Sequence, residues 1–521
     1  KKNNRKSELM LREMEMWACA ASLRGWTYPI EQADGLWKTL LLHQFHDILP
    51  GSSIARVYVE ANEAHEKLQA DAAQITADAA AALMEKKEGV TVFNSLSFER
   101  NSIVTLPDSF ADGAALSDGS PIPVQKTQEG VKALVSIPSC GTVSLYPKAA
   151  EKTQEAALPE AEAASIQKTA DGFVMENGLV SARINGQGEV VSFRLKTGNG
   201  TADGLFREYA AGPMNRLRLF KDVPRKFDAW DIDSNYVCQE IEGACEVAVE
   251  PVEEGLEAVL KVTGRISQSA YTQYIRLAAD SRRLEFETII DWKELHRLLK
   301  TSFPVNVYAE NGINEIQFGY VERPAHRSRP YDQERFEVCN HHYSAFRDAN
   351  GGAAVLNDCK YGISMNENSL ELTLLRASAA PEMRADNKVH HFTYAFTAWE
   401  GSFMDSDVVR QGYELNVKPY LASGSGQDFS MLSIDRANII LDTMKPAEDG
   451  SGDIILRLYE SKKAATSASV QLSRELLTAG SSVYACDMLE NVTEELSVSD
   501  GALALSFHPF EIRTIRIAGP R

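Results

Sequence analysis

The sequence predicts an α+β protein of several domains, with a helical N-terminal region followed by a long β-rich region. Between residues 7 and 87 apolar residues recur every three or four positions, which is the spacing of amphipathic helices. From Gly89 onward the pattern changes to alternation, and residues 284–290 place Leu, Phe, Thr and Ile on one face and Glu on the other. A chain of 521 residues is too long for one hydrophobic core, so we expect three or four domains.

Three helices account for the N-terminal region. The first carries an apolar stripe over residues 10–21. The second covers residues 36–49, and its broad apolar surface predicts a largely buried helix that stops at Pro50-Gly51. The third runs from about residue 54 to residue 83. Short connections between long amphipathic helices favour an antiparallel three-helix bundle within residues 1–88.

The remaining residues predict antiparallel sheets, because many short alternating segments are separated by turns rich in Gly, Asn and Asp. We expect a small β domain at residues 89–150 and a large β-sandwich at 168–430. A second, C-terminal β-sandwich is expected at 431–521. Residues 151–167, rich in Ala and Glu, are expected to form a linker.

Composition excludes two classes of partner. The formal charge is −19, from 54 basic and 73 acidic residues, and no basic patch is visible, so a nucleic-acid partner is not expected. No apolar run is long enough to cross a bilayer, so no membrane partner is expected either. The seven cysteines are scattered without CxxC spacing, which favours reduced thiols in a cytoplasmic protein. Residues 1–6 do not form a signal peptide and are interpreted as an internal start.

One segment carries the strongest chemical signal. Residues 44–53 read Gln-Phe-His-Asp-Ile-Leu-Pro-Gly-Ser-Ser and place a potential metal ligand, His46, beside a carboxylate, Asp47, in the last turn of the second helix. Ser52 and Ser53 offer N-caps for the third helix. The alternatives are a core histidine and a helix-terminating aspartate, although a carboxylate at a helix C-terminus opposes the helix dipole. A single imidazole is not a catalytic zinc site, which uses three protein ligands.

This segment resembles the metal-binding signature of the glycoside hydrolase family 38 α-mannosidases, and the likeness extends along nearly the whole chain. The matches are most similar to the bacterial and cytosolic-type members. The resemblance implies a helical middle domain, a large β-sandwich of the galactose-mutarotase-like supersandwich type, and smaller β domains. Further matching segments are residues 92–97, 228–233, 302–305, 315–319, 322–324, 356–362, 391–395, 456–460 and 509–512.

The resemblance also implies a function, which is that of a metal-dependent retaining α-mannosidase releasing terminal α-linked mannose from glycans or oligosaccharides. In the family, the His of the signature binds a divalent metal and the adjacent Asp reaches the sugar or the metal shell. His46 is therefore the expected ligand of Zn²⁺, or of another ion such as Co²⁺, and Asp47 an expected substrate contact. The family's N-terminal α/β domain, which carries the nucleophile and the acid/base, has no counterpart here. We therefore expect no catalytic residue in this chain, and no activity from it alone.

Trp230 and Asp231 are a second candidate contact with the sugar, because an aromatic ring suits its C–H face and a carboxylate its hydroxyls. The alternative is an ordinary strand residue beside an acidic turn. The expected partners are a mannose-containing glycan and the missing catalytic domain, which should cover an exposed surface that includes His46, Asp47 and Trp230. Self-association to a homo-oligomer stays open.

Two other functions stay open. One is a carbohydrate-binding or structural fragment without turnover, in which the β region binds or shapes glycans. The other is a relative that hydrolyses mannosylglycerate-like small glycosides.

Overall fold

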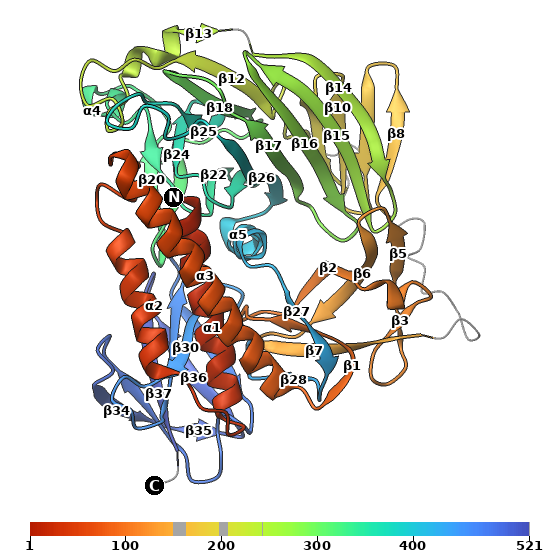
Figure 1. The fold of residues 1–521 in the computed structure, drawn as a ribbon, viewed down its shortest axis with the longest axis vertical. Coiled ribbons are helices and arrows are strands. Elements are labelled where there is room, and N and C mark those ends of the chain that lie inside the picture. The colour runs from red at the N-terminus through yellow and green to blue at the C-terminus, as the bar shows by residue number, and fades with distance from the viewer. Residues whose placement is uncertain (149–162, 197–206, 242, 520–521) are drawn as a thin grey trace.

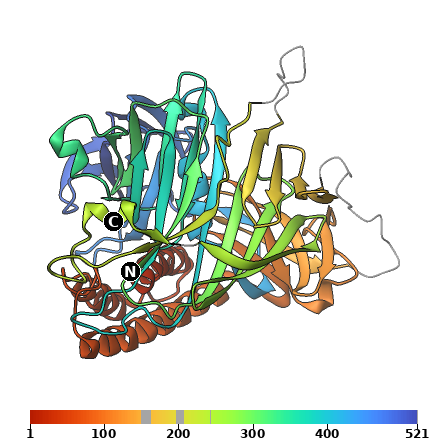
Figure 2. The same cartoon turned by 90° about the horizontal axis from the view of Figure 1, so that it is seen from above.

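The computed structural model describes residues 1–148, 163–196, 207–241 and 243–519, and it consists mainly of antiparallel β-sheets with a few helices (Figures 1 and 2). The α+β multidomain class predicted from the sequence is confirmed. The strand pairs are antiparallel in the large sheets and in the small ones. Over the described parts of the chain, no helix has the length and apolar character needed to cross a membrane.

Three long helices, α1 (Lys2–Ser22), α2 (Ile30–His43) and α3 (Ala55–Leu83), form the N-terminal region. In Figure 1 they run along one side of the molecule, from the large sheets to the C-terminal sheets. The side chain of Ser7 lies 2.9 Å from that of His65, and Arg24 bonds to the carbonyl of Leu83, so α1 and α3 run in the same direction. Helix α2 runs back in the opposite direction beside them, and its buried residues are Ala33, Leu36 and Leu40.

The small β region begins at Lys86, two residues after the Met84 that caps α3. Its core lies between two sheets and contains Val92, Val104 and Leu145. One sheet has the order β27-β1-β7-β3-β4 with β28 on β7, and the other β2-β6-β5. The strands are β1 (Lys86–Asn94), β2 (Arg100–Leu106), β3 (Ala114–Ala115), β4 (Pro121–Ile122), β5 (Val124–Thr127), β6 (Gly130–Ile137), β7 (Gly141–Pro147), β27 (Tyr420–Ser425) and β28 (Phe429–Ser430).

This strand order corrects the expected end of the large sandwich at residue 430. β27 and β28 pair with β1 and β7, so the chain returns to the small β region before residue 430. Most of the expected linker at 151–167 lies outside the described residues, and Ser165 already begins strand β8.

The large sandwich is built from nine-, six- and four-stranded sheets. Their orders are β14-β15-β16-β17-β26-β23-β22-β19-β20, β13-β12-β18-β25-β24-β21 and β11-β10-β9-β8. The strands are β8 (Ser165–Thr169), β9 (Gly172–Glu176), β10 (Val180–Asn185), β11 (Val190–Leu195), β12 (Arg216–Lys221), β13 (Glu240–Ile241), β14 (Ala244–Glu253), β15 (Glu257–Ile266), β16 (Ser269–Ala278), β17 (Leu284–Asp291), β18 (Arg297–Pro304), β19 (Asn311–Ile316), β20 (Gly319–Pro324), β21 (Val338–Cys339), β22 (Tyr343–Asp348), β23 (Gly351–Asn357), β24 (Gly362–Asn366), β25 (Ser369–Arg376) and β26 (Val389–Glu400). Two short helices, α4 (Pro330–Gln333) and α5 (Val408–Asn416), accompany them.

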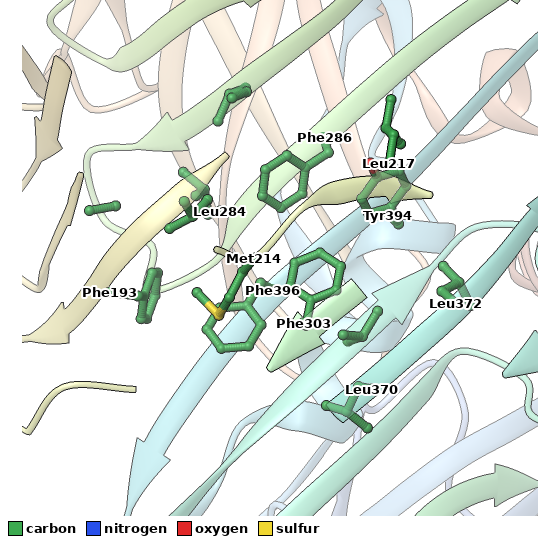
Figure 3. Close-up of a cluster of buried hydrophobic side chains, with 14 of the residues drawn as sticks. Phe193, Met214, Leu217, Leu284, Phe286, Phe303, Leu370, Leu372, Tyr394 and Phe396 are labelled. Atoms are coloured by element: carbon green, nitrogen blue, oxygen red, sulfur yellow. The ribbon is translucent and has the colours of Figure 1, made fainter. Parts of the chain in front are cut away.

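Aromatic side chains fill the space between the nine- and six-stranded sheets (Figure 3). Phe303 of β18 stacks on Phe396 of β26 with ring centres 5.6 Å apart, and it meets Phe286 of β17 at 5.9 Å. The expected alternation of residues 284–290 is present, because Leu284, Phe286 and the other apolar members of that set point into this core.

The C-terminal sandwich packs against the helices. One sheet has the order β30-β31-β37-β33-β34 and the other β29-β32-β36-β35. A shared core joins Leu11 and Trp17 of α1 to Leu441 and Leu456 of the sandwich. The strands are β29 (Leu432–Ile434), β30 (Ile439–Pro446), β31 (Ile454–Glu460), β32 (Thr466–Leu472), β33 (Ser482–Cys486), β34 (Val492–Leu496), β35 (Val498–Ser499), β36 (Ala502–Phe507) and β37 (Ile512–Ala518).

Candidate functional site

The segment with His46 and Asp47 is a turn and not the last turn of a helix. Helix α2 ends at His43, where the amide of Gln44 is shared between the carbonyls of Leu40 and Leu41. Residues 44–51 then form successive turns. The expected helix at 36–49 therefore ends six residues early, because the backbone tightens into turns before Pro50 is reached.

His46 and Asp47 are both accessible to solvent. Their side chains are 67% and 40% exposed, and Nε2 of His46 lies 3.4 Å from Oδ2 of Asp47. The imidazole also lies on the ring of Phe45, with ring centres 4.2 Å apart. A buried core histidine, the alternative weighed from sequence, is therefore not what the structure shows at position 46.

Hydrogen bonds from the two serines hold this turn in shape. The hydroxyl of Ser53 donates to the carbonyl of Asp47 at 2.8 Å, and the amide of Ser52 donates to the same oxygen at 3.2 Å. The hydroxyl of Ser52 lies 3.4 Å from Oδ1 of Asp47. Helix α3 is capped at Ile54 without any side-chain bond, so the expected role of the serines as N-caps is wrong. They bind back to Asp47 instead.

The donor set fits part of a metal site and not a whole one. His46 offers an accessible imidazole and Asp47 an accessible carboxylate, which are ligand types that Zn²⁺ accepts. Within the described ranges, no group of three or more His, Cys, Asp or Glu side chains is placed to hold a metal ion. Any metal bound at His46 would therefore need ligands from outside the described residues.

Trp230 and Asp231 lie on a turn and not on a strand. The amides of both residues donate to the carbonyl of Phe227, at 2.7 and 2.9 Å, and Phe227 itself has a φ of 54°. The indole of Trp230 is exposed, as is the ring of Phe227. Trp230 is therefore not the ordinary strand residue that the alternative interpretation of the sequence expected.

This turn is fixed to the segment that follows β25. The carboxylate of Asp228 accepts hydrogen bonds from the amides of Ala379 and Ala380 at 2.6 and 3.1 Å, and it lies 3.1 Å from Nε2 of His296. Arg376 also donates to the carbonyl of Asp231. Neither Asp228 nor Arg376 is among the sequence-based candidates, because nothing local marks a carboxylate that binds amides about 150 residues away.

Tyr58 of helix α3 binds the segment that carries His46 and Asp47. Its hydroxyl accepts a hydrogen bond from the amide of Ser53 at 2.7 Å. Burial raises the pKa of Tyr58 above its ordinary value, and the carboxylates of Asp386, Glu382 and Asp47 raise it further. Glu382 and Asp386, whose charges act on Tyr58, belong to the same segment as Ala379 and Ala380, which bind Asp228.

Large apolar side chains are exposed on α2, in the turns that follow it and at the start of α3. This differs from the sequence-based expectation of a largely buried second helix. Large exposed apolar patches are typical of interaction sites. The exposed side chains are Ile30, Leu41, Leu42, Phe45, Ile54 and Val59. We call this set the α2 surface.

Comparison with known families places the chain. Residues 1–83 match the alpha mannosidase middle domain. Residues 175–384 match the glycosyl hydrolases family 38 C-terminal domain, and residues 438–515 match the glycosyl hydrolases family 38 C-terminal beta sandwich domain.

The chain belongs to glycoside hydrolase family 38.

Individual relatives agree with this assignment. The family 38 chain is 31% identical to alpha-mannosidase 2C1 of Homo sapiens over 99% of its own length and 48% of that protein. It is 29% identical to alpha-mannosidase G of Dictyostelium discoideum, over 99% of its length and 51% of the relative. The chain thus spans about half the length of these relatives. The crystal structure of an alpha-mannosidase from Enterococcus faecalis V583 has the same fold, with a TM-score of 0.78 at 16% identity over 99% of this chain and 66% of that one.

Proposed function

We propose that this chain forms the middle and C-terminal part of a metal-dependent retaining α-mannosidase that releases terminal α-linked mannose from glycans or oligosaccharides. The match of three family 38 domains in the order helical, large β, small β supports this proposal. The exposed pair His46 and Asp47 is the observation that carries it, because accessible ligand atoms occupy the turn that resembles the metal signature.

Each residue would have a limited task. His46 would bind a divalent ion, Zn²⁺ or Co²⁺, through a neutral ring nitrogen, and Asp47 would accept a hydrogen bond from a sugar hydroxyl or from the metal shell. The bound ion would supply positioning and electrostatic stabilisation of the sugar. Trp230 would offer its ring to the C–H face of the sugar, and Asp231 would accept from a hydroxyl.

The remaining chemistry would come from outside residues 1–521. Retaining hydrolysis uses two carboxylates about 5–5.5 Å apart, one as nucleophile and one as acid/base. We propose that both belong to a catalytic domain that covers the α2 surface. The exposure of Leu41 and Leu42 supports this, since large apolar side chains on a helix are normally covered.

A cytoplasmic location is part of the same proposal. All seven cysteines of the chain are free thiols in the structure, and reduced thiols persist in the cytoplasm.

The test is an aryl α-mannoside assay of the full-length protein and its variants. His46→Ala should lower activity at least about 100-fold, as loss of a metal ligand would, and should lower the bound metal with little effect on folding, because the side chain is exposed. His508→Ala, at another exposed histidine, is the matched control. Full activity and full metal content in His46→Ala would refute the assignment.

The same assay separates the alternatives. Residues 1–521 alone should show no turnover, and turnover of about 1–10³ per second would place the catalytic carboxylates in this chain. Sugar binding by the full-length protein without turnover would favour a carbohydrate-binding protein, for which the exposed Trp230 beside Asp231 is the supporting observation. Turnover restricted to mannosylglycerate-like substrates would favour the small-glycoside relative.

A further inference from the structure

The turn that carries His46 and Asp47 is held by very little packing. The side chains of Phe45 and His46 are exposed and no residue from 44 to 51 is fully buried, so burial alone does not fix this backbone. Its order therefore depends on hydrogen bonds. Backbone bonds within the turn join the amides of Ile48 and Leu49 to the carbonyl of Phe45. Further bonds tie Asp47 to Ser52 and Ser53, both of which are buried.

Ser53 is bound on both sides. Its hydroxyl donates to the carbonyl of Asp47, and its amide donates to the hydroxyl of Tyr58 at 2.7 Å. Within the described residues, the bond to Tyr58 is the one side-chain hydrogen bond in this network that reaches the turn from helix α3. A helix can serve as an anchor only when it is itself fixed.

Helix α3 meets that condition. Ala61 and Leu68 are buried in its contact with the other helices. The side chains of Ser7 and His65 lie 2.9 Å apart, and Gln69 donates to the hydroxyl of Ser7 at 3.1 Å. The position of Tyr58 is therefore set by the packing of α3 on α1.

We propose that Tyr58 is a positioning residue for the family 38 site: through Ser53 it transmits the fixed position of α3 to the turn that presents His46 and Asp47. This inference rests on the proposed function of that turn. The residue acts through Ser53 and Asp47 and does not itself contact the metal or the sugar.

The experiment compares Tyr58→Phe with Tyr308→Phe in the full-length protein. Tyr58→Phe keeps the ring and removes only the hydroxyl. Tyr308 is 87% exposed, which makes it a matched control for the loss of one phenol oxygen. Amide hydrogen exchange of residues 44–53 reports the order of the turn, and this measurement requires neither metal nor activity.

We expect Tyr58→Phe to speed exchange in residues 44–53 and to weaken Zn²⁺ binding about tenfold, in the range found when groups supporting a metal ligand are removed. Activity should fall at limiting Zn²⁺ and largely recover in excess Zn²⁺, since the ligands are still present. His46→Ala should not recover, and Tyr308→Phe should match the wild type. Because bound metal also stabilises a folded protein, urea unfolding without Zn²⁺ is compared for the two tyrosine variants, and equal midpoints show that the loss is in metal binding and not in general stability.

Three outcomes overturn the proposal. Unchanged exchange in Tyr58→Phe would show that the turn does not depend on the hydroxyl. Faster exchange with unchanged Zn²⁺ affinity would show that the bond only stabilises the local fold. Full activity of His46→Ala would refute the proposed function of the turn and with it the role of Tyr58. The exchange data would still report separately whether Tyr58 orders the turn.

Discussion

The core of the large sandwich and the α2 surface are made of the same kinds of side chain, but they differ in what covers them. Phe286, Phe303 and Phe396 are buried between two sheets of the same chain. Leu42 and Phe45 are exposed over about half or more of their area. Both regions follow the apolar spacing of their secondary structure, so spacing alone does not say which partner an apolar face will meet.

The difference shows which apolar side chains are covered by this chain and which are exposed. The sandwich core is closed by strands of this chain on both sides, and its rings stack on one another. Helix α2 packs its inner face against α1 and α3, while its outer face is exposed to solvent. The free energy of folding of this chain should therefore depend strongly on the first region and weakly on the second.

The largest effect is expected in the sandwich. Phe303→Ala should lower the free energy of unfolding by about 3–5 kcal/mol, because it leaves a cavity between Phe396, which stacks on Phe303, and Phe286, which meets it edge-on. Urea unfolding followed by tryptophan fluorescence would measure it. Val191→Ala, at a partly exposed position on β11, is the control and should change the value by no more than about 0.5 kcal/mol. A loss below about 1 kcal/mol for Phe303→Ala would show that this core is not tightly packed.

The contrast within α2 can be tested by two leucines of one helix. Leu40 is fully buried and Leu42 is exposed. In residues 1–521, Leu40→Ala should cost about 2–5 kcal/mol, and Leu42→Ala about 0.5 kcal/mol or less. Urea unfolding would measure both changes in the free energy of unfolding. Equal losses would mean that the outer face of α2 is covered within this chain, which would contradict the comparison.

The sequence predicts the helix-to-strand change well, because both periodicities are local. It does not predict the return of β27 and β28 to β1 and β7, since those pairings join residues more than 280 positions apart. The end of α2 is also missed. Pro50 is an obvious stop signal, but the turns that end the helix at His43 contain no residue that forces them.

The site is predicted in the same uneven way. His46 and Asp47 are found because a resemblance marks them, and no local signal would suffice. Tyr58 falls on the apolar stripe of the third helix, and its apolar ring is enough to explain a tyrosine there. Nothing in the sequence indicates that its hydroxyl accepts a hydrogen bond from Ser53. Asp228 belongs to a short acidic stretch, and its bonds to Ala379 and Ala380 become visible only once the sheet has brought them together.

A pH effect should distinguish the helical region from the aromatic core. Burial raises the pKa of Glu15 on α1 to about 7, although Lys445 and a hydrogen bond from Trp37 of α2 favour its charged form. The folded state then holds a proton on Glu15 that the unfolded state releases near its ordinary pKa of about 4.3. This group therefore opposes folding as pH rises from about 4.3 to 7, by at most about 4 kcal/mol.

Glu15→Gln removes that titration. Relative to the wild type, the variant should gain stability between pH 5 and pH 8, whereas the stability difference for Phe303→Ala should stay flat over the same range. Urea unfolding at a series of pH values would measure both. A constant difference between Glu15→Gln and the wild type would show that Glu15 is ionised in the folded protein at all these pH values.

The smallest effect is expected at Trp230, which is exposed and lies on a turn held by Asp228. If its ring binds the C–H face of a sugar, Trp230→Ala should raise the KM of the full-length protein for an aryl α-mannoside roughly 3–10-fold, or about 1 kcal/mol, with kcat little changed. Trp230→Phe keeps an aromatic face and should recover most of the loss. Neither variant should alter urea unfolding, because no core contact is removed. An unchanged KM in Trp230→Ala would exclude this turn from the sugar site. The turn that carries His46 and Asp47 would then hold the remaining candidate contacts of this chain.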